Sequence, residues 1–135
     1  MFQGKEQKVL YSYYNSKLQA IGKLENGKMI GEWEIYNEDG GMLAKGRFNA
    51  ESEKDGYWQW WDNYGRLSKE ENYKAGLYDG LVKVYYPATG RVKYTVNYSN
   101  GDLDGAYYFY HESGALSEKK TFEKNELIDT YYTYH

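Results

Sequence analysis

Three short groups of residues have side chains of the types used in catalysis or metal binding. The first is Ser113 beside His111 and Glu112, which together resemble the nucleophile, base and acid of a triad. A triad needs a scaffold that holds its members in mutual hydrogen-bond geometry, whereas these three residues share one predicted hairpin loop. The only other histidine is His135, so we expect no site built on histidine acids, bases or metal ligands. We interpret both histidines as solvated residues.

The second group is NGDLDG, from Asn100 to Gly105, which imitates the first half of a calcium-binding loop with its alternating oxygen ligands. The bidentate glutamate expected at the twelfth position of such a loop is His111 here. The same spacing recurs in the chain as a turn without the acidic residues. We therefore predict a structural turn and no metal site.

The third group is Glu32 and Glu34, which fall on one face of a predicted strand and could in principle work as an acid and base pair. Nothing nearby in the sequence predicts a pocket that would raise the pKa of either carboxyl. The chain also has no phosphate-binding loop, dinucleotide fingerprint or nucleophile elbow. We predict no catalytic residues, no bound metal and no cofactor, and we do not expect an enzyme.

The composition predicts one folded all-β domain. A length of 135 residues suits a single domain. Aliphatic residues are sparse, but 18 tyrosines and 4 tryptophans raise the aromatic fraction to 19%, and the net charge is only −3, which argues against disorder. Tyrosine and tryptophan favour pleated, half-buried surfaces, because one end of the ring packs while the polar tip stays near water.

The charge balance and the lack of cysteine restrict the partners and the compartment. Because 20 acidic residues outnumber 17 basic ones, we expect neither nucleic acid nor a membrane surface as a partner. The absence of cysteine excludes disulfides and thiol catalysis and fits a reducing compartment. The start of the chain, MFQGKEQKVLYSYY, lacks the apolar run of an export signal, which predicts a cytoplasmic location. A periplasmic location stays open, since a trimmed signal peptide would leave the same sequence.

A repeat of about 25 residues organises the chain. Each repeat opens with a glycine that is followed by apolar residues two and four positions later, and a second glycine lies in the middle of the repeat. The opening glycines are at positions 31, 56, 80 and 105, and the central glycines are at positions 40, 65, 90 and 114. The closing turns are Asn26-Gly27, Ala75-Gly76 and Asn100-Gly101, which favour positive φ and tight hairpins. The predicted unit is strand, turn, strand, turn.

The single predicted domain divides into units 7–30, 31–55, 56–79, 80–104 and 105–129, with half a unit at 130–135. The ends are degenerate, as the caps of repeat arrays are: Ser16 replaces a central glycine, and Asn125 and Asp129 replace later glycines. The segment Asn49 to Asp55 is longer than its counterparts and is predicted to be a charged surface loop. About eleven strands spaced by ~4.8 Å predict an elongated open antiparallel β-meander of about five hairpin repeats, roughly 50 Å long.

Alternation along the strands separates two faces. The apolar face, which we predict to be the core, carries Trp33, Ile35, Trp58, Trp60, Val82, Val84, Tyr107 and Phe109. The other face is amphipathic, and tyrosine and tryptophan dominate binding energy at recognition surfaces. Its candidate partner-binding residues are Glu32, Glu34, Tyr36, Tyr57, Trp61, Lys83, Tyr85, Tyr108 and Tyr110. The alternative is that the column Tyr36, Trp61, Tyr85 and Tyr110 forms a cross-strand ladder that only stiffens the sheet.

The pattern G-x-W-x-x-Y, a short turn ending in glycine, an apolar residue and then N-G-x-x-x-G resembles the MORN-repeat variant family. The resemblance covers residues 31–134 and extends more weakly back to residue 9. It implies an open antiparallel β-meander. Many bacterial members of this family are described as antitoxins or immunity proteins, and eukaryotic MORN repeats are linked to membrane association and scaffolding. The sequence departs from the pattern at Ile30, Val82, Tyr107, Asn125 and Asp129.

We therefore predict a non-catalytic, protein-binding repeat module, and the resemblance implies an antitoxin or immunity protein that neutralises a toxin. The main alternative is a scaffold or membrane-associated MORN-repeat protein, which the acidic balance disfavours. A third hypothesis is a carbohydrate-binding surface on the aromatic column. The identity of the partner and the oligomeric state stay open.

Overall fold

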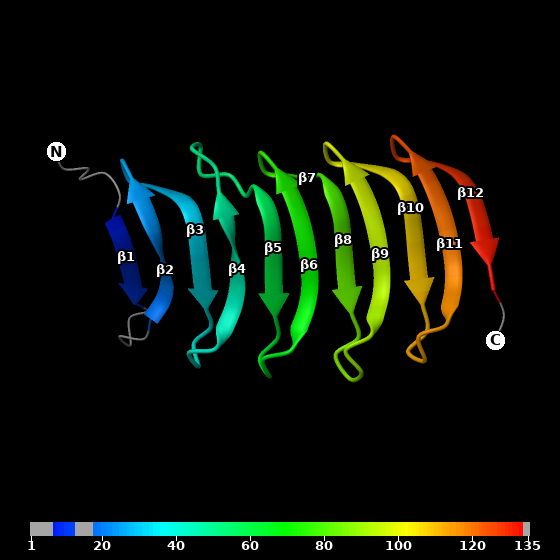
Figure 1. Ribbon diagram of the computed structural model, residues 1–135, viewed down its shortest axis with the longest axis horizontal. Helices are drawn as coiled ribbons and strands as arrows, with labels where there is room; N and C mark the ends of the chain where they lie inside the picture. Colours follow the sequence, from blue (N-terminus) through cyan, green and yellow to red (C-terminus); the bar gives the residue numbers. More distant parts are fainter. Residues whose placement is uncertain (1–6, 13–17, 134–135) are drawn as a thin grey trace.

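A computed structural model describes residues 7–12 and 18–133, with only the backbone of 7–12 and of Leu18 placed. The predictions for Ser16, Tyr134 and His135 lie outside these residues. The described chain is all-β (Figure 1). Its strands are β1 (Gln7–Ser12), β2 (Leu18–Glu25), β3 (Lys28–Tyr36), β4 (Met42–Phe48), β5 (Gly56–Trp61), β6 (Leu67–Lys74), β7 (Leu77–Tyr78), β8 (Gly80–Tyr85), β9 (Val92–Ser99), β10 (Asp102–Tyr110), β11 (Leu116–Glu123) and β12 (Glu126–Tyr132).

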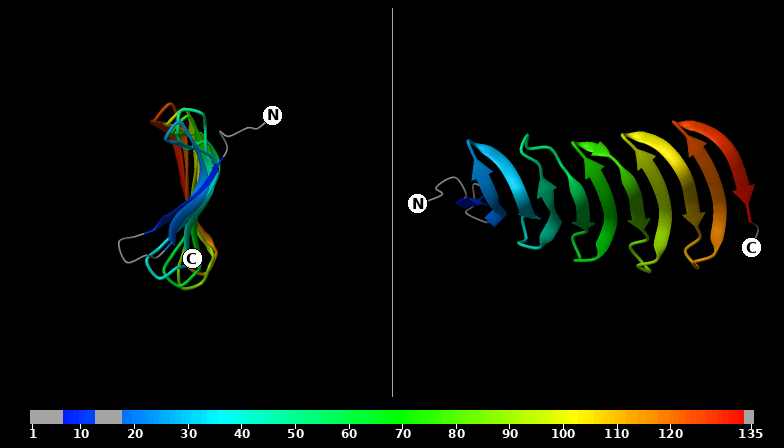
Figure 2. Two further views of the ribbon diagram at one scale, coloured as in Figure 1. Left: turned by 90° about the vertical axis from the view of Figure 1, so that its left-hand side faces the viewer. Right: turned by 45° about the horizontal axis from the view of Figure 1, so that its top comes forward.

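All the described strands join one open antiparallel sheet in which neighbours in sequence are neighbours in space. Only β7, a short strand that pairs with β6, lies off this path. Figure 2 shows the sheet as a single twisted layer, and the described residues place no second layer over either face. The predicted elongated meander of hairpins is confirmed. Within the described residues there is no helix that could cross a membrane.

The hairpin turns follow the predicted backbone chemistry. Asn100 and Gly101 have φ of 49° and 87°, and positive φ at both central residues is the mark of a type I′ turn, whose twist matches that of the flanking strands. Asn26-Gly27 and Ala75-Gly76 are similar. Lys124 and Asn125 adopt the same turn without glycine, at φ of 48° and 71°. Asparagine visits this conformation more readily than most residues, and the side chain of Asn125 is held by hydrogen bonds to Asp102 and Leu103 at the start of β10.

The aspartate before an opening glycine ties one unit to the turn of the next. Asp79 Oδ1 accepts a hydrogen bond of 2.9 Å from the backbone N–H of Asn100. The same bond joins Asp55 to Ala75 at 3.2 Å and Asp104 to Lys124 at 3.4 Å. The recurring Asp-Gly pair therefore has a structural explanation.

The loop from Asn49 to Asp55 has no tight turn of this kind. Asn49 Oδ1 instead accepts hydrogen bonds from the backbone N–H groups of Glu51 and Glu53, both at 3.0 Å. The side chains of these two glutamates are exposed, as predicted for a charged surface loop. The aspartate position that would reach this loop from the preceding unit is Ile30, which has no side-chain acceptor.

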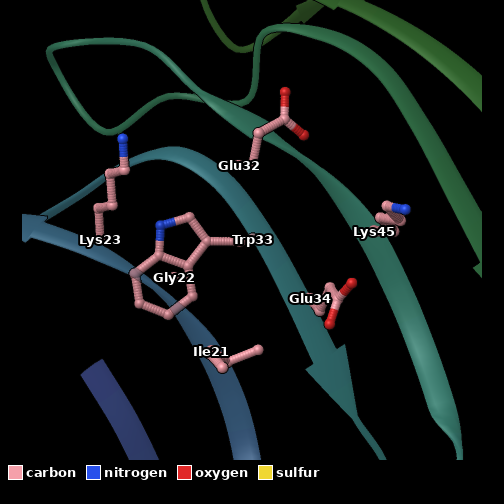
Figure 3. A pocket seen from close by; sticks show the side chains of 7 residues that line it. All are labelled: Ile21, Gly22, Lys23, Glu32, Trp33, Glu34 and Lys45. Atoms are coloured by element: carbon pink, nitrogen blue, oxygen red, sulfur yellow. The ribbon is translucent and has the colours of Figure 1, made fainter. Parts of the chain in front are cut away.

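Tryptophan is buried in this single layer by lying against a glycine of the neighbouring strand. Figure 3 shows the indole of Trp33 over Gly22, and a Cβ added to Gly22 would come 2.1 Å from Cδ2 of that ring. Trp58 lies on Gly46 in the same way, at 2.0 Å. The two tryptophans are only 1% and 0% exposed. In the later units, where Val82 and Tyr107 replace tryptophan, the facing position carries a side chain.

We call the side of the sheet that carries Trp33 and Trp58 the tryptophan face, and the opposite side the charged face. The predicted core is confirmed for Trp33, Trp58 and Val82, which are buried. The other five predicted core residues are only half-buried, because no second layer covers them; they are Ile35, Trp60, Val84, Tyr107 and Phe109.

Candidate partner-binding face

Strand register builds a row across the middle of the charged face that is polar at every position after the first, and we call it the polar row. Each strand on the path from β2 to β12 contributes one residue: Ile21, Glu34, Lys45, Gln59, Glu70, Lys83, Thr95, Tyr108, Lys119 and Tyr131. Glu34 is paired in register with Lys45, and Glu70 with Lys83, and such opposite-charge pairs stabilise a sheet. Three of the nine candidate residues, Glu34, Lys83 and Tyr108, belong to this row.

Glu70 is the centre of the candidate face. The hydroxyl of Tyr57, on β5, donates to Oε2 of Glu70, and the hydroxyl of Tyr85, on β8, donates to Oε1. Both carboxylate oxygens are therefore engaged by phenols from the two flanking strands. Tyr57 is still 48% exposed, so its ring remains available to a partner.

The protonation states of this cluster follow from its contacts. Burial alone raises the pKa of Glu70, but the hydrogen bonds from Tyr57 and Tyr85 and the charge of Lys83 outweigh it and place the pKa below its usual value. Burial, followed by the hydrogen bond to Glu70, raises the pKa of Tyr57 to about 12. The same causes raise the pKa of Tyr85. At neutral pH the cluster is one carboxylate held between two protonated phenols.

The other candidates are distributed along the same face. Tyr36 donates to Glu34 Oε1 at 2.6 Å, and this hydrogen bond, followed by burial, raises the pKa of Tyr36. The rings of Tyr108 and Tyr110 stack with centroids 6.4 Å apart, and Nζ of Lys119 lies 5.6 Å from the centroid of Tyr108.

Glu32 is exposed and opposes Arg47 in register. It lines a shallow hollow of about 200 Å³ that is also bordered by Glu34, Lys23 and Lys45 (Figure 3). The two predicted carboxylates therefore share this hollow with two lysines. Such a surface offers paired charges of both signs to a partner.

The predicted aromatic column does not form a direct ladder. Among the described residues, no two of the rings of Tyr36, Trp61, Tyr85 and Tyr110 are in contact. These residues lie on alternate strands, which puts them roughly 9.6 Å apart across an intervening strand. The register partners on those strands are aliphatic or methionine: Met42, Leu67, Val92 and Leu116. Apart from Tyr108 with Tyr110, the ring contacts of the described residues lie on the tryptophan face, as in the pair Tyr78 and Tyr98 at 4.8 Å.

Sequence reasoning missed two adjacent glutamates that organise both faces. Glu70 holds the tyrosines of the charged face, and Glu71, only 1% exposed, lies on the tryptophan face. Glu71 accepts hydrogen bonds from Trp60 Nε1 at 2.6 Å, Tyr73 at 2.8 Å and Tyr78 at 2.6 Å. The available signal was positional, since Glu71 occupies the place in its unit that Gly46 has in the preceding one.

The pKa of Glu71 reflects two opposing effects. Burial by itself raises the pKa, but the three hydrogen bonds and the charge of Lys69, whose Nζ lies 3.2 Å from Oε2, outweigh it. The pKa of Glu71 therefore lies below its ordinary value, and the buried carboxyl is ionised at neutral pH. Burial and the bond to Glu71 in turn raise the pKa of Tyr78 to about 12.

The residues that imitated catalytic and calcium sites have structural partners. Ser113 Oγ accepts a hydrogen bond of 3.3 Å from the backbone N–H of Ala115 within its turn. Asp102 Oδ1 accepts one of 2.8 Å from Nδ2 of Asn125 in the next turn. Nowhere in residues 18–133 do three histidine, aspartate or glutamate side chains gather closely enough to hold a metal ion.

Comparison with known proteins assigns no family to this chain. No protein-family model matches the sequence, and no curated protein matches it at a significant level. The resemblance to the MORN-repeat variant family therefore rests on the repeat pattern alone.

Proposed function

We propose that this chain is a non-catalytic repeat module that binds a protein partner through its charged face. The observation that supports this most directly is the cluster of Tyr57 and Tyr85 on Glu70, next to Lys83. Tyrosine offers a large amphipathic contact surface with few rotatable bonds. Because both phenols are already held by the carboxylate, they lose little further side-chain freedom when a partner docks, which favours affinity.

The charges around this cluster would select the partner. Along the polar row, Glu34 and Lys45 precede Gln59, and Glu70 and Lys83 follow it, so the row alternates in sign. Complementary charges on a partner accelerate association and fix the register of docking, while like charges exclude other proteins. A partner that carries both signs, with an apolar group against Tyr57, fits this surface.

We further propose, from the resemblance, that the partner is a protein toxin and that the chain acts as its antitoxin or immunity protein. A net charge of −3 suits a basic toxin surface through complementary fields. The open sheet supports a stoichiometric inhibitor, because an extended face can cover the active surface of a second protein without an enclosed pocket of its own.

The experiment is co-expression of the tagged chain with the product of each neighbouring gene. We expect one such product to arrest growth when expressed alone and to be neutralised in a stable, stoichiometric complex. The variants Tyr57→Ala and Lys83→Glu should each weaken the complex and lose the rescue. Tyr64→Ala is the matched control, because Tyr64 is 83% exposed but lies in the loop that follows β5 and not on the charged face.

Two outcomes contradict the proposal. One is rescue that is unchanged in the Tyr57→Ala and Lys83→Glu variants, which would move the interface elsewhere. The other is flotation of the purified chain with lipid vesicles in the absence of any protein partner, which would favour the membrane-associated alternative.

A further inference from the structure

Three aromatic rings on the tryptophan face surround the ammonium group of Lys54. Its Nζ lies 5.5 Å from the ring centroid of Trp58, 5.0 Å from that of Trp60 and 5.2 Å from that of Tyr73. A cation within about 6 Å of an aromatic centroid is attracted by the ring quadrupole, and cages of several rings recognise alkylammonium groups. We call these three rings the aromatic cage.

The cage is built on regular strands and is therefore rigid. Trp58 and Trp60 lie on β5 and stack with centroids 6.0 Å apart, and Tyr73, on β6, meets Trp58 edge-on at 6.5 Å. Trp58 is fixed from below by its contact with Gly46. We therefore expect the walls to keep their places when the ammonium group of Lys54 leaves them.

Glu71 strengthens the cage electrostatically. Its carboxylate accepts hydrogen bonds from Trp60 Nε1 and from the hydroxyl of Tyr73, two of the three walls. An anion that accepts a hydrogen bond from a ring's N–H or O–H group polarises that ring and makes its face more negative. Lys69 forms an ion pair with Glu71, and its Nζ also lies 5.3 Å from the centroid of Trp60, so this wall already attracts a second ammonium group.

Lys54 is a tethered occupant whose side chain is held by the rings alone. Its carbonyl accepts a hydrogen bond of 2.8 Å from the backbone N–H of Gly76, so the backbone is fixed. Its Nζ, in contrast, has no carboxylate of the described residues within ion-pair distance. An open hollow of about 680 Å³ is bordered by Lys54 and by one wall of the cage, Tyr73.

We propose that the aromatic cage is a second binding site, which takes an alkylammonium group from a ligand and which Lys54 fills until the ligand displaces it. This site lies on the opposite side of the sheet from the charged face, so it goes beyond the proposed function and stands or fails separately from it. Two sources share the required chemistry: a free ammonium compound and the side chain of a lysine on another protein.

A purely structural role for Lys54 makes a different prediction. In a single layer, the methylene stem of Lys54 could serve only to cover Trp58, in the way that long basic side chains cover apolar surface. Lys54→Met keeps such a stem and removes the charge, whereas Lys54→Ala empties the cage. If Lys54 only covers Trp58, neither variant gains affinity for a cation.

The experiment is a titration of the wild type and both variants with tetramethylammonium chloride, against sodium chloride at equal ionic strength. Tryptophan fluorescence and the NMR signal of the Trp60 indole N–H report on the cage. We expect Lys54→Ala to bind tetramethylammonium at least about five-fold more tightly than the wild type does, because the competing cation–π contact is lost. We expect Lys54→Met to bind it no better than the wild type. Equal affinity of Lys54→Ala and the wild type, or no binding by either, overturns the proposal.

The wild type provides a test that needs no variant to fold. We expect the ring currents of the cage to shift the Cε protons of Lys54 upfield, and tetramethylammonium to move them towards the values of free lysine. Absence of this movement at saturating cation overturns the proposal. Choline and Nα-acetyl-lysine methylamide then identify the source: stronger binding of choline supports a free ammonium ligand, and stronger binding of the lysine derivative supports a protein side chain.

Discussion

Trp58 lies so closely on Gly46 that a Cβ added to this glycine would come 2.0 Å from Cδ2 of the indole. The contact joins β5 to β4 and leaves Trp58 0% exposed in a sheet of one layer. In the next unit the tryptophan position is Val82, and the facing position is Glu71 in place of glycine. A large tryptophan therefore faces a glycine on the neighbouring strand, whereas the smaller valine faces a residue that has a side chain.

We expect Gly46→Ala to destabilise the protein by about 3 kcal/mol, because the methyl group forces the indole off its site and overpacking of a filled core typically costs 1–3 kcal/mol. Chemical denaturation followed by tryptophan fluorescence measures this. Gly41→Ala is the control, since its added Cβ would meet only the side chain of Asn37, at 3.3 Å. Adding Trp58→Val to Gly46→Ala should cost much less than the two changes summed. If the costs of the two changes simply add, the destabilisation by Gly46→Ala does not come from the contact with Trp58.

We expect Glu71→Gln to destabilise the protein by about 2 to 4 kcal/mol at neutral pH, because an amide cannot accept all three hydrogen bonds and leaves Lys69 without its carboxylate. Since the pKa of Glu71 is lowered on folding, its contribution is complete above the ordinary value of 4.5 and is lost as the pH falls through the folded-state pKa. The stability difference between wild type and variant should therefore shrink in acid. Urea denaturation between pH 7 and pH 3 tests this, with the exposed Glu112→Gln as a control. A difference that stays constant with pH would contradict an ionised Glu71.

Much of the fold could be predicted from the sequence because the information is local. Turn residues such as Asn100-Gly101 determine where the hairpins form. Strict alternation along a strand, as around Trp33, determines which residues share a face. The contact of Trp58 with Gly46 and the cage around Lys54 were not predicted. These depend on the register between β4 and β5, which are joined by an irregular loop, and alternation along one strand says nothing about which residue lies opposite on another.

The candidate face was predicted in part for the same reason. The assignment of Tyr57 and Tyr85 to one face follows from alternation. Their convergence on Glu70 does not, because Glu70 lies on β6, a return strand from which no candidate residue was selected. The pattern of opening glycines identifies the outgoing strands and carries no information about the side chains of the return strands.

We expect Glu70→Gln to lower the pKa of Tyr57 from about 12 part of the way towards 10.0. Burial, the larger cause, remains in the variant, while the charged acceptor is lost. NMR of tyrosine labelled with ¹³C at Cζ, titrated from pH 8 to pH 13, measures the change. Since a raised tyrosine pKa stabilises the fold below pH 10 and this stability is lost as the pH rises through the folded-state value, the wild type should also lose more stability than the variant in alkali. An unchanged pKa of Tyr57 in the variant would show that the hydrogen bond to Glu70 does not contribute to the raised value.

We expect Asp79→Ala to loosen the junction between two units without disturbing either face. The change removes the hydrogen bond of 2.9 Å from the Asn100 N–H to the Asp79 carboxylate and should cost about 1 to 2 kcal/mol. Hydrogen exchange should accelerate most at Asn100, because the type I′ turn keeps its geometry but loses its anchor to the preceding unit. Asp39→Ala is the control. Asp39 lies exposed in a loop, and its backbone N–H, which the variant keeps, donates the hydrogen bond to Asn37 Oδ1. Equal protection of Asn100 in wild type and variant would show that the turn is held by the neighbouring backbone bond from Gly101 to Tyr78 alone.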